Sequence, residues 1–238
     1  MPADPYEPHG DLHLARLHVD ALFTYDDRMR IRTAQPSGRP APRFFLSRTR
    51  DGNVWRCRCD LDEAIAHELQ EACAGEPIGD EHLPSPHGAQ RYEQVLARSA
   101  PVGYRQAGPA YAFPSELPQA NDAVLITPAN ADLLCPYLED WRDDVLGRPF
   151  LYAMVIDGCA VSVCTSSRTT ASADEAGVAT APPFRGRGLA RRAVSAWARA
   201  VRDQGRVPLY STSWENTASQ ALARSLGLAR FAADVALG

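Results

Sequence analysis

Residues 184–197 read FRGRGLARRAVSAW, with two glycines directly before a stretch of helical spacing. Ala190, Val194, Trp197 and Val201 recur at i, i+4, i+7 and i+11, which predicts one apolar helix face. A helix N-terminus presents unpaired N–H groups and partial positive charge, and glycines there let a phosphate reach the backbone. The segment therefore predicts a phosphate-binding turn followed by a buried helix. That helix distinguishes it from a flexible glycine–arginine RNA-binding tail.

The basic residues of the chain are all arginine, because the sequence contains no lysine. An anion site must therefore be built from guanidinium groups and backbone N–H groups. Four arginines near the turn are candidate phosphate partners: Arg185, Arg187, Arg191 and Arg192. Neither the three-glycine dinucleotide fingerprint nor the phosphate loop ending in Gly-Lys-Ser/Thr fits this spacing. A formal net charge of −4 gives no support for a nucleic-acid partner.

The composition is that of a soluble globular protein, with 45% hydrophobic residues in a chain of 238. The N-terminus lacks the pattern of a signal peptide, and no apolar run is long enough to cross a bilayer. We therefore expect a cytoplasmic, bacterial-type protein without a membrane partner, whose scattered cysteines are buried free thiols. The spacing of His9, His13 and His18 predicts surface residues and no metal site.

Two segments rich in proline, 76–88 and 113–122, interrupt the chain. We expect an N-terminal α+β region over 1–120 and a second domain over 121–238. In the first region the patterns predict helices over 14–25, 62–74 and 91–100, and a strand–turn–strand over 43–61. In the second they predict strands over 123–127, 175–180, 207–214 and 229–237, a hairpin over 150–167, and helices over 131–146, 189–204 and 216–226. We expect the helix over 131–146 to break near Pro136.

The sequence RGRGLA (185–190) is similar to the acyl-CoA signature Arg/Gln-x-x-Gly-x-Gly/Ala of the GNAT superfamily of N-acetyltransferases. The order of the elements around it resembles the same family over about residues 122–238. The resemblance implies an α/β (α+β) fold with a mixed, mostly antiparallel twisted sheet flanked by helices. It leaves the first 120 residues unexplained, either as a degenerate GNAT-like unit or as an unrelated region that shapes the acceptor site.

The resemblance also implies coenzyme A binding, with acetyl-CoA as cosubstrate. It assigns the pantetheine arm to the backbone of Val178, Ala179 and Thr180. It assigns the diphosphate to the turn made of Arg185, Gly186, Arg187, Gly188, Leu189 and Ala190. Asn216 resembles the residue that reaches the pantetheine, and it is equally a good helix N-cap.

The resemblance suggests Glu175 as the general base, because a glutamate occupies a matching strand position in part of the family. Gly177 and Ala179 share its strand face and leave room beside it for a substrate. Burial near a cleft would raise the pKa of Glu175 toward the working pH. A solvated glutamate at a strand start is the alternative, and Asp174 is a second candidate base. The usual tyrosine acid is replaced by Ala223, which leaves Tyr210, a water molecule or unassisted thiolate departure. We expect Cys164 to be a buried thiol and not a nucleophile.

The sequence thus predicts an N-acyltransferase that moves acetyl from acetyl-CoA to a primary amine of a small molecule in a ternary complex. A backbone N–H near Ala179 would hold the oxyanion. A protein N-acetyltransferase and a non-catalytic CoA-binding sensor or interaction module are the alternatives, and a homodimer stays open. The acidic segment 138–146 reads either as an attraction for cationic amines or as a solvated helix face. The pattern also resembles a subgroup that includes antibiotic self-resistance enzymes.

Overall fold

The computed structural model describes residues 10–35, 41–147 and 150–238. Its contacts divide the chain into two compact units. Unit 1 contains Phe113–Tyr210 and Ala218–Ala229, whereas unit 2 contains the described part of Pro8–Ala112 together with Ser211–Thr217 and Arg230–Gly238. The last strand of the chain therefore belongs to the unit built mainly from the N-terminal half. The boundary expected near residue 120 between two independently folding domains stays a prediction.

Unit 2 combines helices with a mostly antiparallel sheet in the strand order β4-β3-β11-β5. A separate two-stranded ribbon, β1–β2, follows the first helix. The elements of this unit are α1 (Asp11–Leu22), β1 (Phe23–Tyr25), β2 (Ile31–Ala34), β3 (Phe44–Thr49), β4 (Gly52–Cys57), α2 (Glu63–Ala74), α3 (Ala89–Ala97), β5 (Arg105–Ala112) and β11 (Ala229–Leu237). The expected strand–turn–strand and the expected helices α2 and α3 are confirmed. The predicted helix over 14–25 begins earlier, at Asp11, and ends at Leu22.

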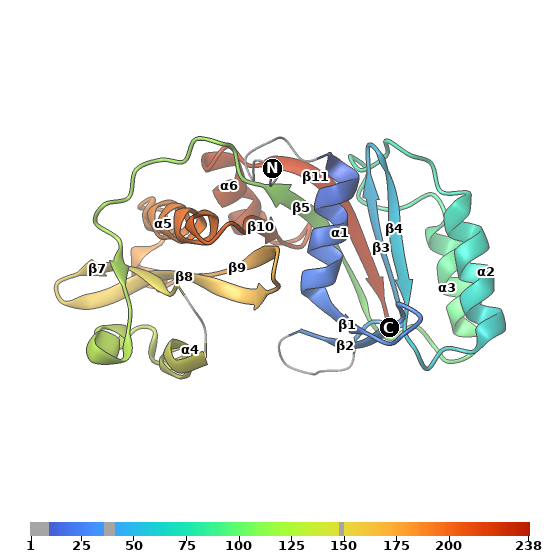
Figure 1. Cartoon of the computed structure of the whole chain (residues 1–238), viewed down its shortest axis with the longest axis horizontal. Coiled ribbons are helices and arrows are strands. Elements are labelled where there is room, and N and C mark those ends of the chain that lie inside the picture. The colour runs from blue at the N-terminus through green and yellow to red at the C-terminus, as the bar shows by residue number, and fades with distance from the viewer. Residues whose placement is uncertain (1–9, 36–40, 148–149) are drawn as a thin grey trace. The chain divides into compact units, whose positions relative to one another are not determined.

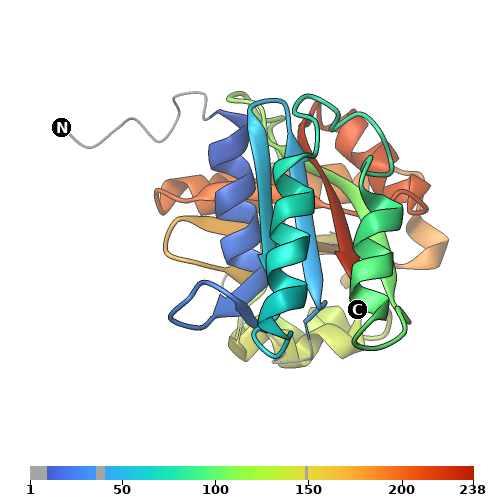
Figure 2. The same cartoon turned by 90° about the vertical axis from the view of Figure 1, so that its right-hand side faces the viewer.

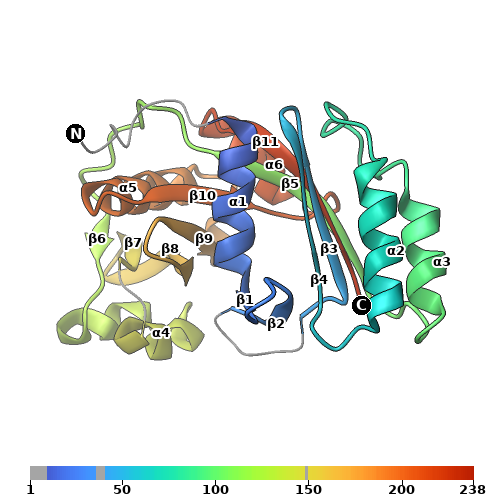
Figure 3. The same ribbon diagram turned by 45° about the vertical axis from the view of Figure 1, so that its right-hand side comes forward.

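Helices cover both faces of the unit 2 sheet. α2 and α3 lie side by side on one face, as Figures 2 and 3 show, and α1 packs against β3 and β4 on the other. Under α2 and α3 lies a continuous apolar core that includes Phe44, Leu46, Leu69 and Tyr92. The alternation of side chains along the strands supplies one apolar set to each helical layer, which is why both layers can be held.

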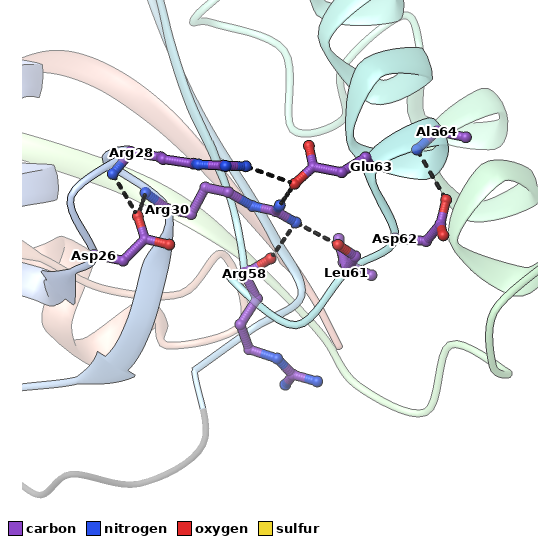
Figure 4. A network of polar contacts seen from close by, with 8 residues as sticks. All are labelled: Asp26, Arg28, Arg30, Arg58, Leu61, Asp62, Glu63 and Ala64. Atoms are coloured by element: carbon purple, nitrogen blue, oxygen red, sulfur yellow. Dashed lines mark hydrogen bonds and ion pairs between the residues drawn. The ribbon is translucent and has the colours of Figure 1, made fainter.

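Several arginines in unit 2 donate to backbone carbonyls, among them Arg30, Arg43, Arg48 and Arg58. The Arg30 guanidinium donates to Glu63 Oε1 at 2.9 Å and to the carbonyls of Arg58 and Leu61 (Figure 4). Asp62 caps α2 by accepting the Ala64 N–H at 2.8 Å. This network ties the turn of the β1–β2 ribbon to the start of α2.

Unit 1 has the strand order β10-β9-β8-β7-β6. Its pairs are antiparallel except for β9 and β10, which run parallel. The elements are β6 (Val124–Leu125), η1 (Pro128–Leu134), η2 (Glu139–Trp141), α4 (Arg142–Gly147), β7 (Tyr152–Ile156), β8 (Cys159–Thr169), β9 (Ala173–Thr180), η3 (Pro182–Phe184), α5 (Leu189–Asp203), β10 (Val207–Ser211) and α6 (Thr217–Ser225). The mixed α+β fold with a twisted, mostly antiparallel sheet and flanking helices is as expected.

The two faces of the unit 1 sheet carry different elements. α5 packs on β7, β8 and β9, and Figure 1 shows it on one side of these strands with α4 on the other. On the α4 side, η1 supplies Leu134 to a core that contains Ile126, Leu151 and Val163, with Ala179 packed against it. The face that carries α5 is called the α5 face below, and the opposite one the η1 face.

The helix predicted over 131–146 is interrupted at Pro136, as expected, but neither part forms a long α-helix. The segment forms two short 3-10 helices and the six-residue α4 instead. Pro136 supplies no N–H and restricts Cys135 to an extended backbone, so the helix cannot continue through them. Thr127 and Asn130 form a reciprocal cap that fixes the start of η1.

Arginines of α5 hold the proline-rich segment 113–122. Arg199 and Arg202 donate to five carbonyls between Phe113 and Pro118. Arg192 forms an ion pair with Asp122. Within the described residues, no helix is long and apolar enough to cross a membrane.

Candidate functional site

The glycine-rich turn before α5 has the backbone that the sequence predicts. Gly186 and Gly188 have φ angles of +75° and +74°, a conformation that other residues adopt only with strain. A Cβ at either position would meet nothing within 4 Å, so open space lies in front of both. Gly188 is the N-cap of α5, and the first N–H groups of that 15-residue helix have no intrahelical acceptor. This turn can therefore cradle an anion such as a diphosphate.

The arginines of the turn are held by protein groups to different degrees. Arg185 Nε donates to the Thr180 carbonyl at 3.2 Å, and the Arg187 guanidinium lies over the Phe184 ring, 5.1 Å from its centroid. Arg191 is exposed. Arg192, a candidate phosphate partner in the sequence, is engaged by Asp122. The Arg185 N–H donates to the Pro182 carbonyl, so the amides that remain for an anion begin at Gly186.

Strands β9 and β10 part after a short parallel ladder. Their register consists of Ala173 with Val207, Asp174 with Pro208, and Glu175 with Leu209. β9 continues to Thr180 and β10 to Ser211. Over the same stretch β9 stays paired with β8. The edge of β9 that faces β10 is therefore open beyond Glu175, and this opening is called the fork below.

The ladder with β8 decides which amides reach the fork. Ala181 donates its N–H to the Val161 carbonyl at 2.9 Å, and hydrogen-bonded pairs alternate along an antiparallel ladder. Ala179, opposite Val163, therefore directs its amide toward β8, whereas Val178 and Thr180 direct theirs toward the fork. The contact of Arg185 with the Thr180 carbonyl agrees with this direction. Of the three predicted pantetheine-binding residues, Val178 and Thr180 have the suitable orientation.

Asp174 and Glu175 are both buried, but they leave β9 on opposite faces. The Ser166 hydroxyl donates to Asp174 Oδ2 at 2.5 Å, and it accepts the Trp197 Nε1–H of α5 at 3.0 Å. Asp174 therefore lies on the α5 face, where Arg206 pairs with it at 2.9 Å. Burial raises the pKa of the Asp174 carboxyl above its usual range. Enclosed by these partners, Asp174 is unsuited to be the alternative base.

Glu175 lies on the η1 face, together with Gly177 and Ala179, since side chains alternate along a strand. Arg168 of β8 is its cross-strand partner in the register. The sequence predicted free space at Gly177 beside the carboxylate. That detail is wrong, because a bulge in β8 brings Ser167 over Gly177, where a Cβ would lie 3.0 Å from Ser167 Cβ. Ser167 Oγ also donates to the Glu175 carbonyl at 3.1 Å.

Tyr210 lies one residue beyond Leu209, so its side chain leaves the sheet on the α5 face. Its hydroxyl is 2.5 Å from the Ser219 Oγ of α6. The two predicted catalytic side chains, Glu175 and Tyr210, thus leave the sheet on opposite faces, and the role of Tyr210 as proton donor stays a prediction. Ala223, where a tyrosine is usual in the resembled family, is fully buried.

Asn216 directly precedes α6, at the position of a helix N-cap. Its N–H donates to the Ser213 carbonyl at 3.2 Å, and its side chain is exposed. The backbone just before it is held within unit 2, because Thr212 and Trp214 donate their N–H groups to Pro109 and Ala107 of β5. Capping and ligand contact therefore both stay open for Asn216.

Several weaker candidates are also placed. Cys164 is fully buried on β8, as expected, and desolvation raises the pKa of its thiol well above the usual value. All six cysteines are free, but the expected burial is wrong for Cys59, which is exposed, and Cys135 and Cys159 are only partly buried. His18 is buried and contacts Asp234, contrary to the surface position we expected. His13 lies in the first turns of α1. His9 is outside the described residues. In residues 10–35, 41–147 and 150–238, no three His, Cys, Asp or Glu side chains cluster as metal ligands.

Glu139 and Asp140 are exposed, and the side chains of Asp143 and Asp144 are outside the described part.

Sequence reasoning missed the Ser166–Asp174–Arg206 network. Its members come from three separate segments, and each alone resembles an ordinary strand or turn residue. The predicted strand over 175–180 begins after Asp174, whereas β9 begins at Ala173 and includes it.

Residues 129–232 match the sequence model of the family described as GNAT acetyltransferase. No curated protein gives a significant sequence match. A GNAT-family acetyltransferase structure from Novosphingobium aromaticivorans shares 21% identity and a TM-score of 0.44, over 57% of this chain and 65% of that one. One from Colwellia psychrerythraea shares 12% identity and a TM-score of 0.48, over 95% of both chains. An aminoglycoside N-acetyltransferase in complex with CoA shares 23% identity and a TM-score of 0.37, over 46% of this chain and 88% of that one.

Proposed function

Residues 129–232 are a GNAT acetyltransferase domain, and on that premise we propose that the chain is an acyl-CoA-dependent N-acyltransferase. It transfers acetyl from acetyl-CoA to a primary amine of a small molecule. The observation that carries this proposal is the fork between β9 and β10, which has the glycine turn at one end and Glu175 at the other. From Glu175 to Thr180 the strand spans about 17 Å at ordinary strand rise.

The turn and the open edge of β9 form one continuous set of backbone donors. The amides from Gly186 to Ala190 would hold the diphosphate, where the glycines leave the approach clear. Thr180 through its N–H and Val178 through its carbonyl would pair with the amide groups of the pantetheine arm as an added strand does, which leaves the Val178 N–H for the thioester oxygen. The thioester would then lie near Glu175, at the closed end of the fork.

The chemistry needs a neutral amine, a stabilised oxyanion and a leaving thiolate. The Glu175 carboxylate accepts a proton from the amine, directly or through water. The amine nitrogen then attacks the thioester carbonyl carbon, and the Val178 N–H donates to the oxygen that becomes negative. Collapse of the tetrahedral intermediate breaks the C–S bond and forms the amide, while the nitrogen loses its second proton to solvent. The released thiolate takes a proton from Tyr210 or solvent.

The acceptor side of the proposal rests on charge. Glu139 and Asp140 are exposed on the segment that precedes α4, beyond the η1 face that carries Glu175. Exposed carboxylates raise the local concentration of a cationic amine. This favours a small amine over an acidic substrate, with a protein amino group as the alternative acceptor.

A non-catalytic CoA-binding sensor is the competing function. It is favoured by one observation: Ala223 is buried where the resembled family has a tyrosine acid. Such a sensor would use the same turn and the same strand edge, but it would not turn over.

The experiment is a screen of primary amines, including peptides with free amino groups, that measures release of CoA from acetyl-CoA. Calorimetry with CoA establishes binding separately. Because the chain has no lysine, its own side chains offer no primary amine as a competing acceptor. Turnover with an amine supports the enzyme. Binding without turnover supports the sensor, and no binding overturns both.

A further inference from the structure

The fork opens beside a buried ion pair that the proposed chemistry does not use. Asp174 is fully buried, and Arg206 Nη1 lies 2.9 Å from its Oδ1. The Ser166 hydroxyl binds the other carboxylate oxygen at 2.5 Å, and Trp197 of α5 donates to Ser166. One connected set of polar contacts thus joins α5, β8, β9 and the residue that precedes β10.

This ion pair lies at the closed end of the fork. The Val207 N–H donates to the Ser172 carbonyl at 2.9 Å, directly beside the pair. Only three residue pairs follow before the strands part, and Asp174 precedes Glu175 in that ladder. Parallel pairing is slightly weaker per residue than antiparallel pairing, so a short parallel ladder needs side chains to fix its position.

Stability alone does not explain charged groups at this place. Removing both ions from water opposes much of their mutual attraction, and apolar side chains of similar volume often stabilise such a site equally well. The Arg206 guanidinium is further confined by Phe150, whose ring centroid is 5.7 Å away. What the pair provides instead is directional contact, because a carboxylate held from two sides fixes the backbone that carries it.

We propose that Asp174 and Arg206 are positioning residues, which fix the closed end of the fork and thereby hold Glu175 and the Val178 amide in place for acyl transfer. The inference rests on the proposed function. Asp174 touches neither substrate in this account, and it acts through the strand that carries the reacting groups.

The test is a double variant, Asp174→Leu with Arg206→Met, because it removes the pair without leaving one buried charge alone. We expect its melting temperature to stay near that of the wild type. With an amine found in the screen, kcat should fall by about tenfold to a hundredfold, the scale of a small misplacement of reacting groups. The dissociation constant for CoA should change less than about threefold, since the Asp174–Arg206 ion pair does not contact the diphosphate turn. The single variant Asp174→Asn should lose kcat as well.

The matched control is a part-buried carboxylate pair in unit 2, His18 Nε2 with Asp234 Oδ2 at 2.8 Å. Asp234→Asn should lower the melting temperature and leave kcat unchanged. An unchanged kcat in the folded double variant overturns the inference, and so does an equal loss of kcat and of CoA affinity.

A wild type that does not turn over, whether or not it binds CoA, overturns the proposed function instead. Whether Asp174 and Arg206 fix the backbone of β9 is then judged by amide hydrogen exchange of the free protein. Faster exchange confined to residues 173–180 in the double variant supports it, and unchanged exchange there overturns it.

Discussion

Glu175 of β9 faces Leu209 of β10 as the last pair of their parallel register. The residue that the sequence marks as a base is therefore the one at which the two strands separate. In a parallel sheet paired residues share a face, so Glu175 and Leu209 both point to the η1 face. The Glu175 carboxylate and the first backbone groups of the fork therefore follow one another directly along β9.

Glu175→Gln should lower kcat by about 10²- to 10⁴-fold, because the amide keeps the shape but accepts no proton from the amine. The dissociation constant for CoA, measured by calorimetry, should stay within about twofold, since the backbone carries that binding. Glu116→Gln, an exposed carboxylate in the segment 113–122, is the control and should change neither quantity. A variant at Glu175 with normal kcat removes this side chain from the chemistry.

Gly186→Ala should cost about 1–2 kcal/mol of unfolding free energy, because φ is +75° there. It should also weaken CoA binding by about tenfold or more, since the new methyl group enters the space in front of the turn. Gly205→Ala is the matched control, because Gly205 has a φ of +71°, equally open surroundings and a place at the far end of α5. Both variants should lose similar stability in denaturant titrations. Equal CoA affinities in the two would show that the turn does not bind the diphosphate.

Gly108→Ala should destabilise the protein by about 3 kcal/mol or more, the upper range for overpacking a buried site. A Cβ at Gly108 would lie 1.8 Å from the Thr212 carbonyl oxygen, which is backbone and cannot rotate away. Gly103→Ala, where a Cβ would meet nothing within 4 Å, should change stability by less than about 0.5 kcal/mol. Equal denaturation midpoints for the two variants would mean that β5 and residues 211–217 can separate at little cost.

Native thiol reactivity should differ sharply between neighbouring cysteines. Burial raises the pKa of Cys57 to about 11 and that of Cys73 to about 12, whereas Cys59 is exposed. At pH 8 only about one Cys57 thiol in a thousand is ionised, so a thiol reagent should label Cys59 first. Mass spectrometry of the labelled native protein checks this order, and rapid labelling of Cys57 at pH 8 would contradict it.

The same thiols predict alkaline destabilisation. Their folded-state pKa values lie above the usual 9.0. The folded state therefore binds the two thiol protons more tightly than the unfolded state does. The stability that this contributes is present below pH 9 and is lost as pH rises toward about 11 for Cys57 and about 12 for Cys73. Denaturant midpoints measured from pH 8 to 11 should fall for the wild type and fall less for Cys57→Ala or Cys73→Ala.

Most elements could be predicted from the sequence because local signals agree with one another. The 3.6-residue periodicity of α5, its end at Gly205 and the Asp157-Gly158 turn between β7 and β8 are examples. In the segment from 131 to 146 the break at Pro136 was predictable, because proline has no N–H. The two 3-10 helices and the short α4 on either side of it were not, because apolar spacing records which residues are buried and does not separate short 3-10 turns from a longer α-helix.

The site was less predictable, since its geometry depends on register between distant segments. The sequence identifies Gly186 and Gly188 because positive φ angles need glycine. It does not show that β9 and β10 part after residues 175 and 209, nor that Asp174 and Glu175 point to opposite faces. It also does not show that Arg192 is paired with Asp122. These facts follow from tertiary contacts, which one sequence does not encode locally.

Arg199 and Arg202 hold the segment 113–118 through its carbonyl oxygens. Every residue type has a carbonyl, so the exposed positions Ser115 and Glu116 can be exchanged while the path of the segment is kept, whereas Phe113 is buried against Trp197. The helix positions 199 and 202 require arginine, because a lysine would offer one ammonium group in place of the planar guanidinium. Redesign of this connection is therefore permitted from the loop side and restricted from the helix side.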